Sequence, residues 1–145
     1  MKAWKNLEKT VAEILGGVRH VRVSYSEKAQ DVDHEYYTVE CKYRKSLPPY
    51  LEECIKYSKF VPVRLYRKIP KLILDGLEQA KSYNPSKTPI LALREHNKRL
   101  IIGVMLMSNL PDVWNFPLTI WNDAYAVFDL RTIAKYTKKE CKDTW

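Results

Sequence analysis

Two almost continuous apolar runs in the second half of the chain restrict its fold more than any other feature. Residues 89–94 read PILALR and residues 100–106 read LIIGVML. Apolar runs of this length without polar alternation are typical of strands that are covered on both faces. A polar turn over residues 95–98 separates them. The sequence therefore predicts an α/β fold with a mixed central sheet flanked by helices.

Apolar residues at helical spacing predict the helices that would cover this sheet. One helix is expected over residues 3–15, ending at Gly16-Gly17, and another from about Pro70 to Tyr83, ending at Asn84-Pro85. Shorter helices are expected at 50–59 and 131–139, and further strands at 18–25 and 124–130. At 145 residues, of which 46% are apolar, the chain suits a single domain over residues 1–145.

A strand expected over residues 34–43 carries polar groups whose spacing suggests chemistry. Side chains alternate between the faces of a strand, so Glu40 and Lys42 share one face while the neighbouring apolar side chains take the other. Asp31 lies nine residues before Glu40 in the preceding turn. Two carboxylates and an ammonium in this arrangement can hold a divalent metal and a water. A Glu-x-Lys pair is also common in strands, where an exposed salt bridge is the ordinary explanation.

The order of the surrounding segments favours the metal site over the exposed salt bridge. Glu8 lies in LEKTVAEILGG at 7–17, Asp31-Val32 follows, VECKYRK occupies 39–45, and LEQA occupies 77–80. In this order, the segments resemble the PD-(D/E)xK nuclease superfamily, in particular its small Holliday-junction-resolvase-like and phage-encoded members. The resemblance covers most of residues 1–107 and implies a restriction-endonuclease-like core. In such a core, the strand expected at 18–25 would lie antiparallel to the Glu-x-Lys strand.

The resemblance assigns a role to each matching residue. It makes Asp31 and Glu40 ligands of Mg²⁺ or Mn²⁺, together with the backbone carbonyl of Cys41. Lys42 would orient or activate the attacking water, or stabilise charge on the phosphate. The remaining members of the expected site are Glu8, which would complete the acidic cluster, and Gln79, which would face it from the later helix.

Two positions depart from the family pattern. Gln30 stands where the family has the proline of its name, and Asp33 is an alternative to Asp31 as the metal ligand. The nine-residue spacing to Glu40 favours Asp31. The chemistry is consistent with the assignment, because carboxylates and waters are the oxygen ligands that Mg²⁺ and Mn²⁺ prefer.

The expected activity is hydrolysis of DNA phosphodiester bonds by a divalent-metal-dependent endonuclease. Branched DNA is the first expected substrate, and it implies a homodimer because paired incisions across a junction need two active sites. The alternatives are a phage or plasmid endonuclease of broader or restriction-type specificity, a non-catalytic DNA-binding protein on the same fold, and an RNA-directed nuclease.

The charge balance favours a polyanionic partner. The chain has 25 Lys and Arg against 17 Asp and Glu, a formal net charge of +8. The cations expected to contact DNA are Arg44, Lys45, Arg64, Arg67, Lys68 and Lys81. A solvated surface is the alternative explanation for any one of them. Residues 47–70 are a possible insertion that binds DNA, covers a subunit interface, or forms a plain surface excursion.

Several function classes find no support in the sequence. No run approaches the roughly 18 apolar residues needed to span a bilayer and no leader-like segment occurs, so cytoplasmic localisation is expected, in a host cytoplasm if the chain is viral. The three cysteines are scattered and form no Cys-x-x-Cys pair, so zinc is not expected. No glycine-rich phosphate loop occurs, which argues against a nucleoside-triphosphate ligand.

Overall fold

The computed structural model describes residues 2–19, 31–56, 70–109, 119–121 and 125–133. These residues form a seven-stranded sheet with strand order β1-β2-β3-β4-β5-β7-β6. The strands are β1 Val18–Arg19, β2 Val32–Asp33, β3 Tyr37–Arg44, β4 Thr88–Glu95, β5 Ile101–Leu106, β6 Thr119–Trp121 and β7 Tyr125–Asp129. The helices are α1 Ala3–Leu15, α2 Pro49–Lys56 and α3 Lys71–Tyr83, with a 3₁₀ turn at Met107–Asn109.

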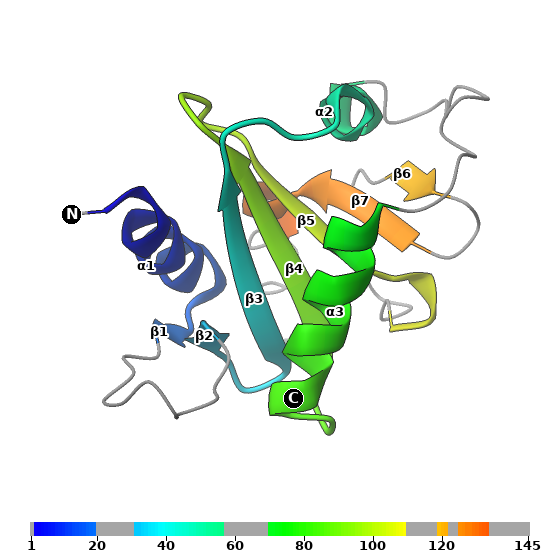
Figure 1. Cartoon of the computed structure of the whole chain (residues 1–145). Helices are drawn as coiled ribbons and strands as arrows, with labels where there is room; N and C mark the ends of the chain where they lie inside the picture. Colours follow the sequence, from blue (N-terminus) through cyan, green and yellow to red (C-terminus); the bar gives the residue numbers. More distant parts are fainter. Residues whose placement is uncertain (1, 20–30, 57–69, 110–118, 122–124, 134–145) are drawn as a thin grey trace.

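The sheet is mixed, as the sequence predicts. β3 and β4 pair in parallel over their full length, from Tyr37 opposite Thr88 to Arg44 opposite Glu95. The other neighbouring pairs are antiparallel. A parallel pair needs a crossover connection, and here that connection includes α3, which packs against both strands. Figure 1 shows α1 on one side of the sheet and α3 on the other.

Each face of the sheet has its own apolar core, which explains the continuous apolar runs. On β4, Ile90 and Ala92 enter the first core, which α1 covers, whereas Leu91 and Leu93 enter the second core, which α3 covers. β5 divides its side chains in the same way, and its residues 101–105 are buried. Both predicted runs are therefore central strands with no solvent-facing side, and the expected α/β class is confirmed.

The two long helices lie where their apolar spacing predicts. α1 buries Leu7, Val11 and Leu15, and it ends at Gly16, whose φ of 73° is the left-handed conformation that glycine adopts readily. α3 approaches β4 closely at Gly76, where a Cβ atom would lie 2.6 Å from a methyl carbon of Leu91. This close approach brings the polar side chains of α3 within reach of β3.

The first strand region differs from the prediction. The family resemblance suggests that the strand at 18–25 lies antiparallel beside the Glu-x-Lys strand. Within the described residues, Val18–Arg19 instead pairs with β2, and β2 pairs with β3. The physical reason is that Val32 and Asp33 themselves take the edge of β3, opposite Val39 and Thr38. Residues 20–25 lie outside the described ranges.

The segment after β3 contributes to the second core. Leu47 and Leu51 are buried there, and α2 covers most of the helix expected at 50–59. Residues 57–69 lie outside the described part of the chain. Among the helices that are described, none combines the length and apolar character needed to cross a membrane.

Candidate active site

The candidate site lies at the edge of β3, beside the first residue of β2, where the pairing of the two strands ends. Asp31 precedes β2, and its N–H donates to the carbonyl of Val39 at 3.0 Å. One step further along β3, the N–H of Cys41 donates to Oδ2 of Asp31 at 2.8 Å. The Asp31 carboxylate thus replaces the next main-chain partner of β3. Main-chain groups two residues apart point to the same edge of a strand, so the carbonyl of Cys41 is directed toward this edge as well.

Glu40 is the most unusual group in this region. It is 3% exposed, its Oε1 accepts from Nζ of Lys42 at 3.0 Å, and its Oε2 is buried without a hydrogen-bond partner. Burial, together with the negative charge of Asp31, raises the pKa of Glu40 to about 7 against the opposing effect of Lys42. The protonated acid can share its proton with Asp31, whose hydrogen bond also raises the pKa of Glu40. The ionised form is costly, because it is buried with an unsatisfied oxygen beside a second negative charge.

Glu8 brings a third carboxylate to the site from α1. It is buried, and its Oε2 accepts from Nε of Arg19 in β1 at 2.9 Å. Burial raises the pKa of Glu8 more than the Arg19 hydrogen bond lowers it, and the charge of Asp31 contributes in the same direction as burial. Asp31 therefore adjoins both Glu8 and Glu40, and the three carboxylates come from α1, the residue before β2, and β3.

Lys42 is held by groups on two elements. Its Nζ contacts Glu40 and donates to Oε1 of Gln79 on α3 at 3.0 Å. The amide nitrogen of Gln79 in turn donates to the hydroxyl of Tyr83 at 2.7 Å. This hydrogen-bonded chain fixes the ammonium beside the acidic group. Gln79 thus contacts Lys42 from α3.

The other predicted residues lie away from this centre or outside the described ranges. Asp33, the alternative to Asp31, is half-exposed and pairs with Nζ of Lys87 at 2.8 Å. The exposed cations Arg44 and Lys45 lie at the end of β3, and Lys81 is exposed in the last turn of α3. The predicted DNA-binding residues outside the described ranges are Arg64, Arg67 and Lys68.

The carboxylates do not form a ready-made cage for a metal ion. No group of three or more His, Cys, Asp or Glu side chains in the described ranges is arranged to hold one. Each of the three acids turns one oxygen to a different donor: Glu8 to Arg19, Asp31 to the N–H of Cys41, and Glu40 to Lys42.

A magnesium-type site needs fewer side chains than such a cage. Mg²⁺ usually takes one or two protein carboxylates and keeps several waters. Asp31, Glu40 and the carbonyl of Cys41 have the hard oxygen donors for such a site. The unpartnered Oε2 of Glu40 is an atom that a cation would satisfy. The thiol of Cys41 is unsuited to be a metal ligand or a nucleophile, because burial raises its pKa and keeps it protonated.

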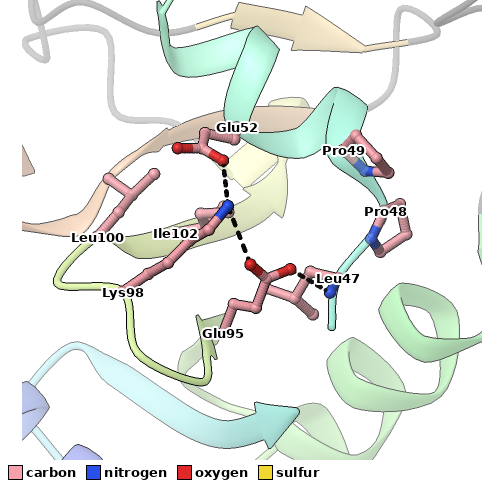
Figure 2. A pocket seen from close by; sticks show the side chains of 8 residues that line it. All are labelled: Leu47, Pro48, Pro49, Glu52, Glu95, Lys98, Leu100 and Ile102. Atoms are coloured by element: carbon pink, nitrogen blue, oxygen red, sulfur yellow. Dashed lines mark hydrogen bonds and ion pairs between the residues drawn. The ribbon is translucent and has the colours of Figure 1, made fainter. Parts of the chain in front are cut away.

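A separate pocket lies between α2 and the loop that joins β4 to β5 (Figure 2). It has a volume of about 90 Å³, well below the ~300 Å³ at which ligand pockets usually begin. Lys98 on its wall is neutralised by Glu52 at 2.6 Å and by Glu95 at 2.9 Å. This pocket is therefore too small for a nucleotide and offers no free charge to one.

Arg19 and Tyr83 are site residues that the sequence reasoning missed. Tyr83 follows Gln79 by four residues on one helix, a spacing that places side chains on the same face, so it could have been found. Arg19 meets Glu8 where β1 packs against α1, a contact that no helix or strand spacing reveals. No protein-family model, no curated protein and no solved structure matches this chain.

Proposed function

We propose that this chain is a divalent-metal-dependent endodeoxyribonuclease of the PD-(D/E)xK type, with a restriction-endonuclease-like core. The observation that carries the proposal is the buried Glu40 carboxylate, which has Lys42 on one oxygen and no partner on the other. Asp31 places a second negative charge beside it. Two adjacent buried carboxylates repel each other when both are ionised, and a bound cation would offset that repulsion.

Each residue then has a defined task. Mg²⁺ or Mn²⁺, held by Asp31, Glu40 and the carbonyl of Cys41, would supply a bound water of lowered pKa and polarise the phosphate. Lys42 presents its ammonium to the phosphate oxygens, where charge develops in the transition state. Gln79 positions that ammonium. Glu8, anchored by Arg19, adds negative charge on the α1 side of the site.

Asp31 is a better candidate for the metal ligand than Asp33. Asp31 adjoins Glu40 and bonds the main chain of the Glu-x-Lys strand, whereas Asp33 is occupied by Lys87. Asp31→Asn should therefore abolish cleavage, and Asp33→Asn should leave most of it. Equal activity in both variants would mean that neither aspartate binds metal.

The proposed substrate is DNA, with branched DNA first and a homodimer as the acting form. The net charge of +8 supports a polyanionic partner, and the exposed cations Arg44 and Lys45 continue directly from the site along β3. Arg64, Arg67, Lys68 and Lys81 remain proposed contacts.

The test is cleavage of labelled four-way-junction, nicked, duplex and single-stranded DNA with Mn²⁺, Mg²⁺ or EDTA. Glu40→Ala and Lys42→Ala should each lower the rate by about 10²-fold or more while DNA binding persists. Glu78→Ala, an exposed acid on α3, is the matched control. Wild-type rates in both site variants would overturn the assignment.

The substrate pattern separates the alternatives. Metal-dependent paired nicking of the junction alone indicates a resolvase, and it requires a dimer in solution. Cutting of every substrate indicates an endonuclease of broader specificity. Binding without cleavage under any metal contradicts the proposed activity and indicates a non-catalytic DNA-binding protein.

A further inference from the structure

The loop between β4 and β5 gathers arginines from three distant parts of the sequence. Nε of Arg94, at the end of β4, donates to the carbonyl of Lys98 at 2.7 Å. Nη1 of Arg131, which follows β7, donates to the carbonyl of Arg99 at 2.9 Å. The carbonyl of Arg44 at the end of β3 accepts from the N–H of His96 at 2.9 Å. We call this group the arginine rim, and its members are Arg44, Lys45, Arg94, Arg99 and Arg131.

The carboxylates near the rim are engaged elsewhere. Glu52 and Glu95 both pair with Lys98, and Glu95 also accepts from the N–H of Leu47 at 2.7 Å (Figure 2). Asp129 accepts from the main-chain N–H of Arg131 at 3.0 Å. Within the described residues, no ion pair joins a carboxylate to a cation of the rim. Among the described residues, the rim cations are therefore not paired with carboxylates, and positive charge exceeds the negative charge of Glu52, Glu95 and Asp129 on this surface.

The arginines hold the loop with only part of their hydrogen-bonding capacity. Arg94 uses Nε and Arg131 uses one Nη1 bond on loop carbonyls, and a guanidinium has several further N–H donors. The planar guanidinium matches phosphate oxygens in paired hydrogen bonds better than a lysine does. Contacts to the main chain also restrict the rotamers of these side chains, which lowers the entropic cost of binding.

The rim is continuous with the candidate active site. Arg44 follows Lys42 by two residues, so the two side chains lie on the same face of β3, about 7 Å apart along the strand. Arg94 lies opposite Tyr43 and so takes the other face of the sheet, which means that the rim runs around the end of β3 and β4. A polyanion that reaches Lys42 would meet Arg44 next and then the β4–β5 loop. An acidic protein is a less suitable partner for the rim, because the candidate site that the rim leads to is one that hydrolyses phosphodiesters.

We infer that the arginine rim binds the phosphate backbone of a nucleic acid and guides it past the β4–β5 loop to the site at Lys42. The guidance of the nucleic acid toward the site rests on the proposed nuclease function, whereas the binding of phosphates by the rim does not. The sequence reasoning included Arg44 and Lys45 among the DNA contacts. The fold adds Arg94, Arg99 and Arg131.

The test compares two variants that lose the same charge. Arg99→Gln/Arg131→Gln removes two rim cations, and Lys9→Gln/Lys71→Gln removes two exposed lysines from α1 and α3. Affinity for a duplex of about 25 base pairs and for a four-way junction is measured in EDTA over a salt series. The rim variant should lower the slope of log K against log salt by about 2 and weaken binding about tenfold or more at ~0.1 M salt. The control should change affinity less than about threefold.

A charge-preserving variant protects the test against misfolding. Arg99→Lys/Arg131→Lys should recover most of the salt slope while it binds more weakly than the wild type, because lysine lacks the planar fork. Equal weakening by the rim and control variants would reduce the effect to net charge and overturn the inference. Unchanged binding by the rim variant would overturn it too, as would a wild-type chain that binds polyglutamate but no DNA.

The two proposals can fail separately. Because binding is measured without metal, a chain that binds DNA through the rim but never cleaves would contradict the nuclease function alone. A chain that cleaves, and whose rim variant binds and cleaves like the wild type, would contradict the rim alone.

Discussion

At the scale of single residues, Glu40 shows which of two opposing effects prevails in the site. The nearby ammonium of Lys42 favours the ionised carboxylate, but burial and the charge of Asp31 oppose it and win, since the pKa rises from 4.5 to about 7. One pKa unit corresponds to about 1.4 kcal/mol. The ionised Glu40 therefore costs the folded chain about 3 kcal/mol when no cation is present.

Glu40→Gln should stabilise the metal-free protein at alkaline pH. The folded-state pKa lies above the ordinary value, so the stability linked to protonated Glu40 is fully present below about pH 4.5 and is lost as pH rises through about 7. A neutral amide avoids this loss. We expect the variant to exceed the wild type by about 1–3 kcal/mol in unfolding free energy at pH 8, and by much less near pH 5, in urea titrations with EDTA.

Comparison with the wild type at each pH cancels the contributions of titrating groups that do not interact with Glu40. Glu78→Gln serves as the control, because Glu78 is exposed on α3 and should show no such pH dependence. If the advantage of Glu40→Gln were the same at both pH values, Glu40 would not be the buried acid described here.

Gln79 should act on the reaction through Lys42. Gln79→Ala removes the amide oxygen that holds the ammonium, so we expect kcat to fall about tenfold with little change in KM, as for a lost contact that matters mainly in the transition state. Ser82→Ala is the control, since Ser82 only bonds the carbonyl of Gln79 from the exposed side of α3. A large rise in KM with an unchanged kcat would instead make Gln79 a substrate-binding residue.

At the scale of elements, the reliability of a prediction follows the length of its pattern. The runs at 89–94 and 100–106 and the stripe of α1 are long, and β4, β5 and α1 lie where they were expected. β2 has two residues, too few for any periodicity, and it changes the pairing of the sheet edge. The site depends on that edge. Because β2 begins only at Val32, the N–H of Cys41 donates to the Asp31 carboxylate and not to a main-chain group of β2.

Gly103 in β5 gives a test of the central packing. It lies opposite Phe128 of β7, and a Cβ atom there would meet the Phe128 ring. Gly103→Ala should therefore destabilise the chain by about 1–3 kcal/mol through overpacking, as measured by urea unfolding. Phe128→Leu should be destabilising alone, but the double variant should lose less than the sum of the two. Additive losses would show that the ring does not lie over Gly103.

At the scale of the whole molecule, the fold class was more predictable than the assembly of the site. Each strand and helix carries its apolar pattern locally, so an α/β sheet follows from the sequence alone. The meeting of Glu8, Asp31 and Glu40 depends on how α1 and β2 pack around β3, and the family resemblance supplied that expectation. The pairs of Arg19 with Glu8 and of Arg131 with Arg99 arise only from tertiary structure, and no spacing in the sequence indicates them.

Metal binding should couple the site to the stability of the entire fold, and pH should control the coupling. A metal ligand must lose its proton, and Glu40, with a pKa of about 7, holds its proton at pH 5.5 and has mostly lost it at pH 8. A cation at about ten times its Kd stabilises the folded state by ~1.4 kcal/mol, or roughly 4 °C in Tm for a domain of this size.

We therefore expect Mn²⁺ to raise the Tm by several degrees at pH 8 and by clearly less at pH 5.5, with EDTA reversing both shifts. Glu40→Gln should abolish the shift at pH 8 although it makes the metal-free protein more stable. This opposition separates a cation site from a structural ion pair, because loss of a structural pair would lower the Tm with or without Mn²⁺. A Mn²⁺ shift that is equal at both pH values, or that persists in Glu40→Gln, would place the ion away from Glu40.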